Sequence, residues 1–509
     1  MKESRIYNST KNIILGIVSQ ILTLILNFGT KIVFVRILGA EYTGINGLFS
    51  NVITILSVAE LGMGSAIIYS MYKPLAENDQ KRISELMNFY KKIYNIVAIT
   101  IFIIGIGLVP FIKYLVNTSV EIEHINVYYL LFLINTVASY IFASRTVILN
   151  ANQKLYIIKI YNFIIYFIQC ILQIVILLLT RNFIFYLIVQ ILSTLITNIV
   201  GAIITEKMYP YIKQKSELPK DERKKIFENM KSMLYYKIGG VILNNTDNIL
   251  ISILVGTVWV GYYSNYLIVI SAIEAFTTIV FNALTASVGN LVAKSNKDRQ
   301  FKVFKVINMI CNIMFGMCAI ELIILFNDFI LIAFGNEYVL EKEIVYAIVL
   351  LFYIKGILNP IWVYRETTGL FKNTKYIILI TAGLNIIFSI VLGKKFGVFG
   401  IVLATILARV MTNIWYEPII LYKVHFHQDV KEYFKNNGKN FIITIIIIFI
   451  CTIVFERCQK INIFIFLIKG IVCMLIAIIL YYFVYKNTEE YEYIKKNLFI
   501  PAINKIKKG

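Results

Sequence analysis

Several charged residues stand inside otherwise apolar stretches of the sequence. The cationic ones are Lys31, Arg145, Lys237, Lys355, Arg365, Arg409 and Lys469. If these stretches span a membrane, a charge near the bilayer centre costs at least about 2.5–3.5 kcal/mol, so it faces a bundle interior or a water-filled cavity. Ammonium and guanidinium groups suit phosphate and carboxylate because they supply fixed charge and several hydrogen-bond donors. The set predicts a cationic cavity that accepts an anionic substrate.

Three carboxylates, Asp247, Glu60 and Glu274, also lie within apolar runs. They are candidates for binding a coupling proton or Na⁺, because burial raises the proton affinity of a carboxylate. A simpler interpretation is that charges of opposite sign pair between helices and only hold them together. The sequence alone leaves both interpretations open.

The elements that position these charges are predicted to be helices with one polar side. Lys237, Asn244, Asp247, Asn248 and Ser252 fall within an arc of about 140° on a helix, and the opposite side is Ile, Val and Leu. A short turn then leads into a second apolar run. We expect the polar side of such helices to line the cavity.

Composition indicates an all-α polytopic membrane protein. Hydrophobic residues make up 59% of the 509 residues, the mean hydropathy is +0.74, and apolar runs of about 20 residues recur along the chain. The net charge of +21 lies mainly in the loops between these runs. Membrane topology and anionic lipid headgroups account for it, so we expect the lipid bilayer as a partner and no nucleic acid.

We expect about fourteen transmembrane helices, and the loop charges predict their orientation. The spans centre on residues 12–35, 45–70, 93–116, 125–149, 156–179, 182–205, 233–255, 260–292, 303–326, 344–366, 375–392, 397–422, 441–456 and 462–485. We count 35 Lys and Arg in the loops and tails on the side of the N-terminus and 8 in the opposite loops. Because basic loops stay in the cytoplasm, both termini are predicted to be cytoplasmic.

The sequence also contains an internal repeat. Gly39 and Gly44 match Gly256 and Gly261 at an offset of 217 residues, and the polar stripe of the first span then falls on that of the seventh. Spans 4 and 10 match at an offset of 220, which places Arg145 on Arg365. Six helices per repeat predict two parallel-related lobes with a substrate site between them.

The repeat predicts the domain organisation of the chain. We expect an N-terminal six-helix lobe at 1–205, a cytoplasmic linker at 206–232 and a C-terminal six-helix lobe at 233–424. Residues 425–509 would then form a cytoplasmic loop, two additional transmembrane helices and a basic C-terminal tail.

Missing motifs narrow the functional class. The sequence contains no GxxxxGK[ST] nucleotide-binding loop, no HExxH and no plausible Cys/His zinc spacing. We therefore expect no metal site, no cofactor and no catalytic residues. Transport without enzymatic activity is the class that remains, with H⁺ or Na⁺ coupling as an option.

Three segments resemble a known family. FVRILGAEYTGINGLFSNVITILSVAELGMGSAII, with Leu38-Gly39, Gly44 and Glu60-Leu61-Gly62, resembles the first two spans of the Wzx-type polysaccharide-unit flippases. These belong to the multidrug/oligosaccharidyl-lipid/polysaccharide (MOP) exporter superfamily. TDNILISILVGTVWVGYYSNY at 246–266 resembles the start of their second lobe, and FGVFGIVLATILARV at 396–410 resembles their span-12 region.

The resemblance implies a MATE-like fold and alternating access by two six-helix lobes. The implied substrate is an undecaprenyl-diphosphate-linked oligosaccharide, which crosses the bacterial cytoplasmic membrane for capsule or O-antigen-like polysaccharide synthesis. Lys31, Arg145, Lys237, Lys355 and Arg365 would contact the diphosphate or acidic sugars, and Asp247 would bind the coupling ion. Polysaccharide polymerase and other glycan-assembly proteins are the implied partners.

Other functions stay open at this point. A lipid II-type peptidoglycan flippase would have the same fold and a similar anionic lipid substrate. A MATE-like exporter of small cationic molecules is disfavoured, because a cationic cavity would repel its substrate. A membrane scaffold for a glycan-synthesis complex would leave the cavity charges without a role.

Overall fold

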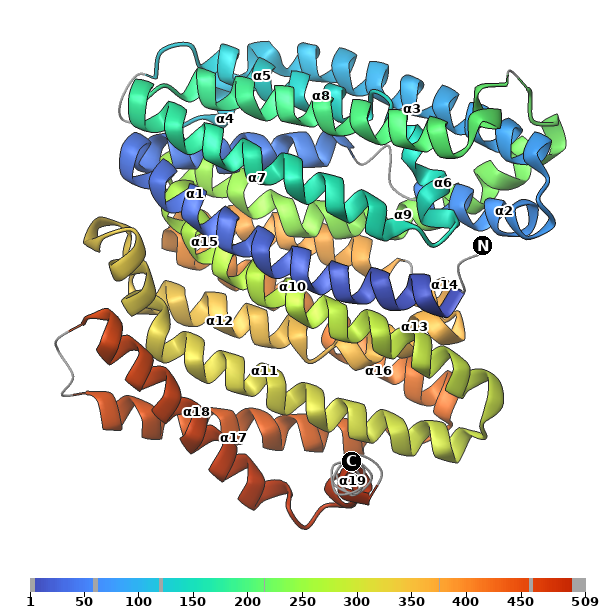
Figure 1. Cartoon of the computed structure of the whole chain (residues 1–509). Coiled ribbons are helices and arrows are strands. Elements are labelled where there is room, and N and C mark those ends of the chain that lie inside the picture. The colour runs from blue at the N-terminus through green and yellow to red at the C-terminus, as the bar shows by residue number, and fades with distance from the viewer. Residues whose placement is uncertain are drawn as a thin grey trace, which may run out of the picture. The chain divides into compact units, whose positions relative to one another are not determined.

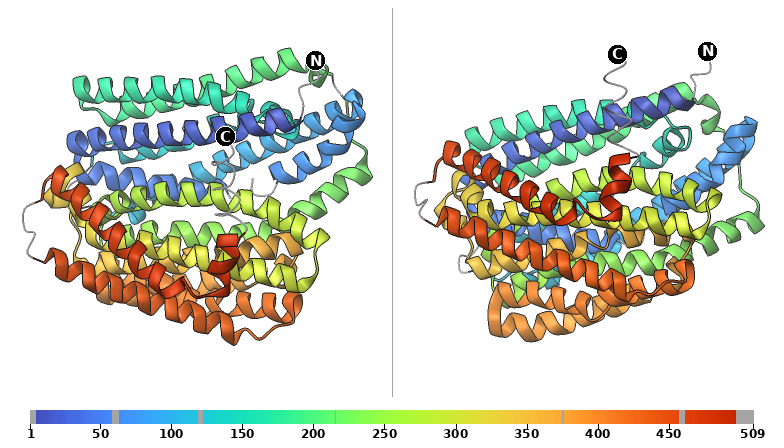
Figure 2. Two further views of the ribbon diagram at one scale, coloured as in Figure 1. Left: turned by 60° about the horizontal axis from the view of Figure 1, so that its bottom comes forward. Right: turned by 90° about the horizontal axis from the view of Figure 1, so that it is seen from below.

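The structure is a computed structural model that describes residues 5–57, 63–118, 122–214, 216–374, 376–456 and 461–496. Every regular element within these ranges is helical. Figure 1 shows the long helices of each part of the chain, and the two views of Figure 2 show α17 and α18 lying along α11. The predicted all-α membrane fold is confirmed.

Eleven helical stretches of the described chain are long and apolar enough to cross a membrane. One of them, Leu15–Leu56, covers the first predicted span and part of the second, and Ile377–Phe426 covers two predicted spans. The helix that contains the predicted span 233–255 is not among the eleven, since its polar stripe lowers its hydropathy. The number fourteen stays a prediction.

The chain divides into two compact units, residues 1–264 and 265–509. The long helices of the first unit are α1 (Arg5–Leu56), α2 (Met63–Glu77), α3 (Gln80–Leu108), α5 (Ile125–Tyr140), α7 (Leu155–Thr180), α8 (Phe183–Met208), α9 (Lys220–Leu254) and the start of α10 (Thr257–Lys294). Short turns of helix join them: η2 (Val109–Phe111), α4 (Ile112–Leu115), η3 (Ala143–Thr146), α6 (Val147–Ala151) and η4 (Pro210–Lys213).

The second unit contains the rest of α10 and the remaining helices. These are α11 (Lys297–Ala333), η5 (Asn336–Tyr338), α12 (Lys342–Gly356), α13 (Asn359–Thr368), α14 (Phe371–Thr374), α15 (Ile377–Val410), α16 (Asn413–Ile420), the π-helix η6 (Leu421–Phe426), α17 (Lys431–Phe455), α18 (Ile463–Tyr485) and α19 (Glu489–Ile494). The lobe and linker boundaries predicted from the repeat stay predictions.

The last two long helices pack on α11 through a compact core. Ile320 of α11, Ile447 and Cys451 of α17, and Cys473 and Ala477 of α18 are all buried in one cluster. The opposite face of α17 is apolar but exposed, as expected for a helix that meets lipid. The two additional C-terminal helices are therefore integrated into the second unit.

The segment before α9 is fastened to α3. Ser84 and Asn88 both donate hydrogen bonds to the carbonyl of Gln214, at 2.8 and 2.6 Å. Lys92 and Arg223 donate to the carboxylate of Glu217, which holds the pKa of this exposed group below its usual range. The predicted linker is thus anchored to the first unit by specific polar contacts.

Within the first unit, α1 and the first turns of α10 cross at close range, and glycines stand at the crossing. Gly39 has φ 83° and Gly256 has φ 142°, which L side chains rarely adopt, so glycine fits the turn at both positions. After the turns, the backbone at Gly44 lies against the carbonyl of Thr257, and that at Gly261 lies against the carbonyl of Ala40.

The two contacts of this crossing are equivalent under the sequence repeat. Adding 217 to Ala40 gives Thr257, and adding 217 to Gly44 gives Gly261. Each contact is therefore the counterpart of the other, as expected where repeat-related helices cross near a pseudo-twofold axis. Small residues at such a crossing let two backbones approach closely.

We expect Gly44→Ala and Gly261→Ala to destabilise the protein. A Cβ at either position would collide with a backbone carbonyl, and overpacking of this kind costs about 1–3 kcal/mol. The measurement is the thermal unfolding midpoint of the purified protein in detergent. Gly29→Ala, on the same helix α1 with no atom within 4 Å of the new Cβ, is the control. Equal midpoints for all three variants would contradict the prediction.

Candidate functional site

Two of the predicted cavity cations, Lys31 and Lys237, lie on the repeat-related helices α1 and α9 of the first unit. Both side chains are partly buried. Neither is within ion-pair distance of a carboxylate in the part of the chain that the structure describes. The ammonium of Lys31 lies 5.4 Å from the ring centre of Phe34. Within the described residues, these two side chains are therefore open to a ligand or to water.

Two of the acidic candidates, Asp247 and Glu60, belong to the first unit. Asp247 is buried on α9, where 8% of its surface is exposed. Glu60 lies outside the described residues. Binding of a coupling ion at either carboxylate stays a prediction.

Arg145 is engaged by an acidic partner. It lies in η3 and forms an ion pair with Glu206 near the end of α8, and Lys213 reaches the other oxygen of the same carboxylate at 2.9 Å. Glu206 was not among the sequence predictions, because it falls at the end of a span. Arg145 thus has a structural role whether or not it contacts a substrate.

Lys355 and Glu274 form an ion pair within the second unit. The ammonium of Lys355 on α12 lies 2.9 Å from a carboxylate oxygen of Glu274 on α10. The two side chains are 28% and 38% exposed, so both remain accessible. The structure brings together two residues that the sequence predicted for different roles, one for substrate binding and one for ion coupling.

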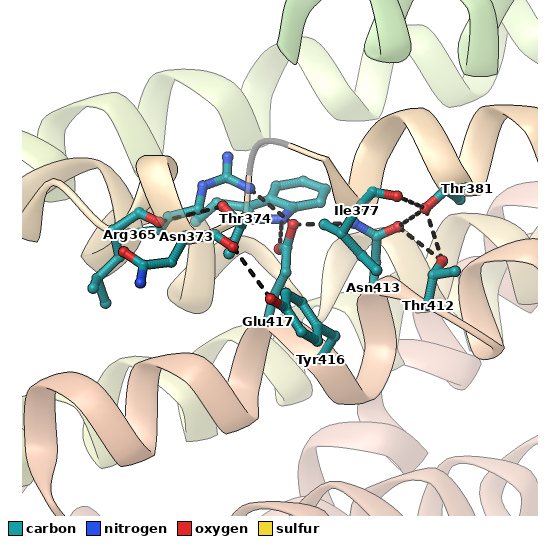
Figure 3. A network of polar contacts seen from close by, with 11 residues as sticks. Arg365, Asn373, Thr374, Ile377, Thr381, Thr412, Asn413, Tyr416 and Glu417 are labelled. Carbon is teal, nitrogen blue, oxygen red and sulfur yellow. Dashed lines mark hydrogen bonds and ion pairs between the residues drawn. The ribbon is translucent and has the colours of Figure 1, made fainter. Parts of the chain in front are cut away.

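Arg365 belongs to a buried polar network that Figure 3 shows from close by. Its guanidinium donates to one carboxylate oxygen of Glu417 at 3.0 Å, and the indole of Trp362 donates to the other at 2.8 Å. The amide of Asn413 also donates to Glu417, at 3.0 Å, and the hydroxyl of Thr381 lies 2.6 Å from the carbonyl oxygen of Asn413. The network ties α13 to α15 and α16.

The charges of this network are almost fully removed from solvent. The side chains of Arg365 and Glu417 are 5% and 0% exposed. A buried ion pair needs such additional hydrogen bonds, because removal of both charges from water is costly. The geometry therefore gives Arg365 a role in the packing of the second unit, and its contact with a substrate stays a prediction. Arg409 of α15 is also buried.

A second buried ion pair holds the last helices. Lys469 of α18 lies 2.8 Å from Asp328 of α11, and both residues are buried. The sequence predictions included Lys469 among the intramembrane charges but not Asp328, although Asp328 stands alone in an apolar run. Lys469 therefore fits the simpler interpretation, in which charges of opposite sign pair between helices and hold them together.

The arginines at the repeat-matched positions each form an ion pair with a glutamate. Arg145 pairs with Glu206, one residue past the predicted span 182–205, and Arg365 pairs with Glu417, inside the predicted span 397–422. The first pair is partly exposed and the second is buried. Only the arginines are matched by the repeat, because Glu206 and Glu417 do not fall on each other at the offset of 217 or 220.

The fold and the intramembrane charges define a multi-pass α-helical membrane protein. Residues 9–285 match the model of the family described as polysaccharide biosynthesis protein. This match covers more than half of the chain, and the protein belongs to that family. Comparison with curated protein sequences finds no match.

Solved structures confirm the predicted MOP fold. The inward closed conformation of the lipid II flippase MurJ is similar with a TM-score of 0.69 and 18% identity, over 93% of this chain and 99% of that chain. An inward-facing multidrug resistance MATE family transporter of the MOP superfamily is similar with a TM-score of 0.61 and 15% identity, over 79% of this chain and 97% of that chain. The Vibrio cholerae MATE transporter VcmN is similar with a TM-score of 0.53 and 12% identity, over 83% of this chain and 99% of that chain.

We expect Glu417→Ala to destabilise the protein by about 3–5 kcal/mol, because it leaves the buried guanidinium of Arg365 uncompensated. The measurement is chemical unfolding of the purified protein, and Arg365→Met/Glu417→Met should lose less stability than the single variant. Glu77→Ala is the control, because the Lys73–Glu77 pair is 83% and 57% exposed and should contribute less than about 1 kcal/mol. A double variant less stable than Glu417→Ala would contradict the prediction.

Proposed function

We propose that this protein is a flippase for an undecaprenyl-diphosphate-linked oligosaccharide. The observation that carries the proposal is the contrast between paired and available cations. Arg145, Arg365 and Lys469 have acidic partners, whereas Lys31 and Lys237 have no ion pair among the described residues. An ammonium in a membrane interior needs water or an anion, and a diphosphate supplies the anion.

In this proposal Lys355 exchanges its partner, from Glu274 to the diphosphate of the substrate. A diphosphate that binds Lys355 would release Glu274 from its ion pair, and the freed carboxylate could then take up H⁺ or Na⁺. Exchange of this kind would couple substrate binding to an ion without any enzymatic step. Partial exposure of both groups makes them accessible to a ligand.

An apolar cavity in the second unit suits the lipid part of such a substrate. It has a volume of about 370 Å³ and is lined by α10, α11 and α18, with Met317, Phe329 and Phe466 among its side chains and Glu321 as its one ionisable carboxyl group. Methionine and aromatic side chains adapt to a flexible hydrocarbon chain. Part of an isoprenoid tail could lie there.

The family and the fold support the cellular setting. Membership of the polysaccharide biosynthesis family fits a role in capsule or O-antigen-like polysaccharide synthesis. We place the protein in the bacterial cytoplasmic membrane with both termini cytoplasmic, from the distribution of Lys and Arg. A polysaccharide polymerase and other glycan-assembly proteins would act with it.

A lipid II-type flippase is the second candidate. It is favoured by the similarity to MurJ, which extends over 93% of this chain. Both candidate substrates carry a diphosphate on a polyprenol, so the same lysines would serve either. The MATE similarity is weaker, and available cations would repel a cationic drug.

We expect Lys31→Gln/Lys237→Gln/Lys355→Gln to lower outer-leaflet lipid-linked oligosaccharide at least tenfold, because each lost charge-assisted hydrogen bond is worth about 1.5–3 kcal/mol. The measurement uses a deletion strain complemented by the variant and a membrane-impermeant glycan label. Lys73→Gln, at a side chain that is 83% exposed, is the control at equal protein level.

The outcomes separate the two substrates. Trapped cytoplasmic-leaflet oligosaccharide with normal peptidoglycan supports the oligosaccharide flippase, whereas loss of peptidoglycan precursor export with lysis supports the lipid II candidate. Full activity of the triple variant would remove these lysines from the site.

We expect Glu274→Gln to uncouple transport from its driving ion. The variant should lose the dependence of flipping on a proton or Na⁺ gradient, because a neutral amide neither takes up a proton nor supplies a charged ligand. The measurement compares wild type and variant in proteoliposomes with each gradient imposed in turn. Unchanged gradient dependence would assign coupling to another residue, with Asp247 as the next to test.

A further inference from the structure

The first unit contains a polar cavity that the cationic site does not include. Its volume is about 340 Å³, and α1, α7 and α8 form its walls. Uncharged polar side chains dominate the lining, including Gln20, Thr23, Asn162, Gln169, Ser193 and Thr197. These residues follow helical spacing on each helix, so each presents a polar stripe in an otherwise apolar span.

Polar groups of this cavity have unused hydrogen-bonding capacity. The side-chain oxygen of Asn162 is buried and has no hydrogen-bond partner among the described residues. A buried polar group left in this state costs about 1–3 kcal/mol. By contrast, Thr194 bonds to Asn135, and Asn198 donates to the carbonyl of Ala138, so α5 fixes one wall. The α8 wall is thus hydrogen-bonded to α5, and the oxygen of Asn162 remains as an acceptor for a ligand.

The charge of the lining decides which ligand fits. None of the described residues that line the cavity is a carboxylate, and Lys159 is its one charged residue. A metal or coupling cation prefers carboxylate ligands, and an anion would meet mostly neutral groups. Amides and hydroxyls that both donate and accept match the hydroxyl and acetamido groups of a neutral sugar.

Size and aromatic content agree with a sugar ring. Phe163 and Tyr166 lie in the lining and offer apolar faces beside the polar groups. The volume is near the lower end of the range for small-molecule sites, which is about 300–1,000 Å³. A single monosaccharide fits this description better than a longer chain.

We propose that this cavity binds one uncharged monosaccharide, a hexose or N-acetylhexosamine, of the lipid-linked substrate. The inference rests on the proposed function and deepens it. The lysines would recognise the diphosphate, which every substrate of this class shares. The cavity would recognise a neutral sugar and so determine which oligosaccharide is accepted.

The test compares two lipids on the purified full-length protein in nanodiscs. One is undecaprenyl diphosphate, and the other is the same lipid carrying N-acetylglucosamine. The wild type should bind the glycosylated lipid about tenfold more tightly, as two net hydrogen bonds would give.

Two variants on different helices probe the cavity. Asn162→Leu/Thr197→Val and, separately, Gln20→Leu should bind the glycosylated lipid about tenfold more weakly than wild type does. Their affinity for undecaprenyl diphosphate should be unchanged, which also shows that they are folded. Thr180→Val is the matched control, because Thr180 is exposed at the end of α7 and bonds to its own helix.

Each outcome has a distinct meaning. Failure of the wild type to bind either lipid would overturn the proposed function itself. Equal binding of both lipids by the wild type would overturn the sugar site but leave the flippase proposal standing. If the variants bound both lipids more weakly, and to the same degree, the cavity would have a structural role. Selective loss of the glycosylated lipid in both variants, and not in Thr180→Val, would support the inference.

Discussion

The high cost of an isolated charge in an apolar environment governs this structure. Each intramembrane charge must find an opposite charge, a hydrogen-bond network or an aqueous cavity. Arg365 meets this requirement through Glu417 and its amide and indole partners, and Lys469 through Asp328. Lys31 has no such ion pair within the described chain, and its ammonium lies 5.4 Å from the ring centre of Phe34, so water or an anion can meet its remaining requirement.

Glycine provides the second constraint, because it sets how closely repeat-related helices cross. Gly44 contacts Thr257 and Gly261 contacts Ala40. The repeat offset of 217 residues converts one contact into the other, so the same close approach occurs twice. The turn at Gly39 divides α1, so Gly44 lies in its second part, whereas Lys31 and the wall of the polar cavity belong to its first part.

Under the proposed function, groups of different polarity would recognise the different parts of the substrate. Available ammonium groups suit the diphosphate, an apolar cavity suits the isoprenoid, and the neutral polar cavity of α1, α7 and α8 suits a sugar. Each region differs in charge and polarity, as do the parts of a lipid-linked oligosaccharide. Membership of the family described as polysaccharide biosynthesis protein agrees with this proposal.

The sequence by itself determined the helical membrane fold, the turn glycines and the repeat, because apolar periodicity and glycine requirements are local properties of the chain. It also located Lys355, Glu274 and Arg365 within spans. Only the tertiary structure decided their partners: Lys355 meets Glu274 across 81 positions, and Arg365 meets Glu417 across 52. Pairing depends on which helix faces pack together, and spacing along one helix carries no information about its neighbour.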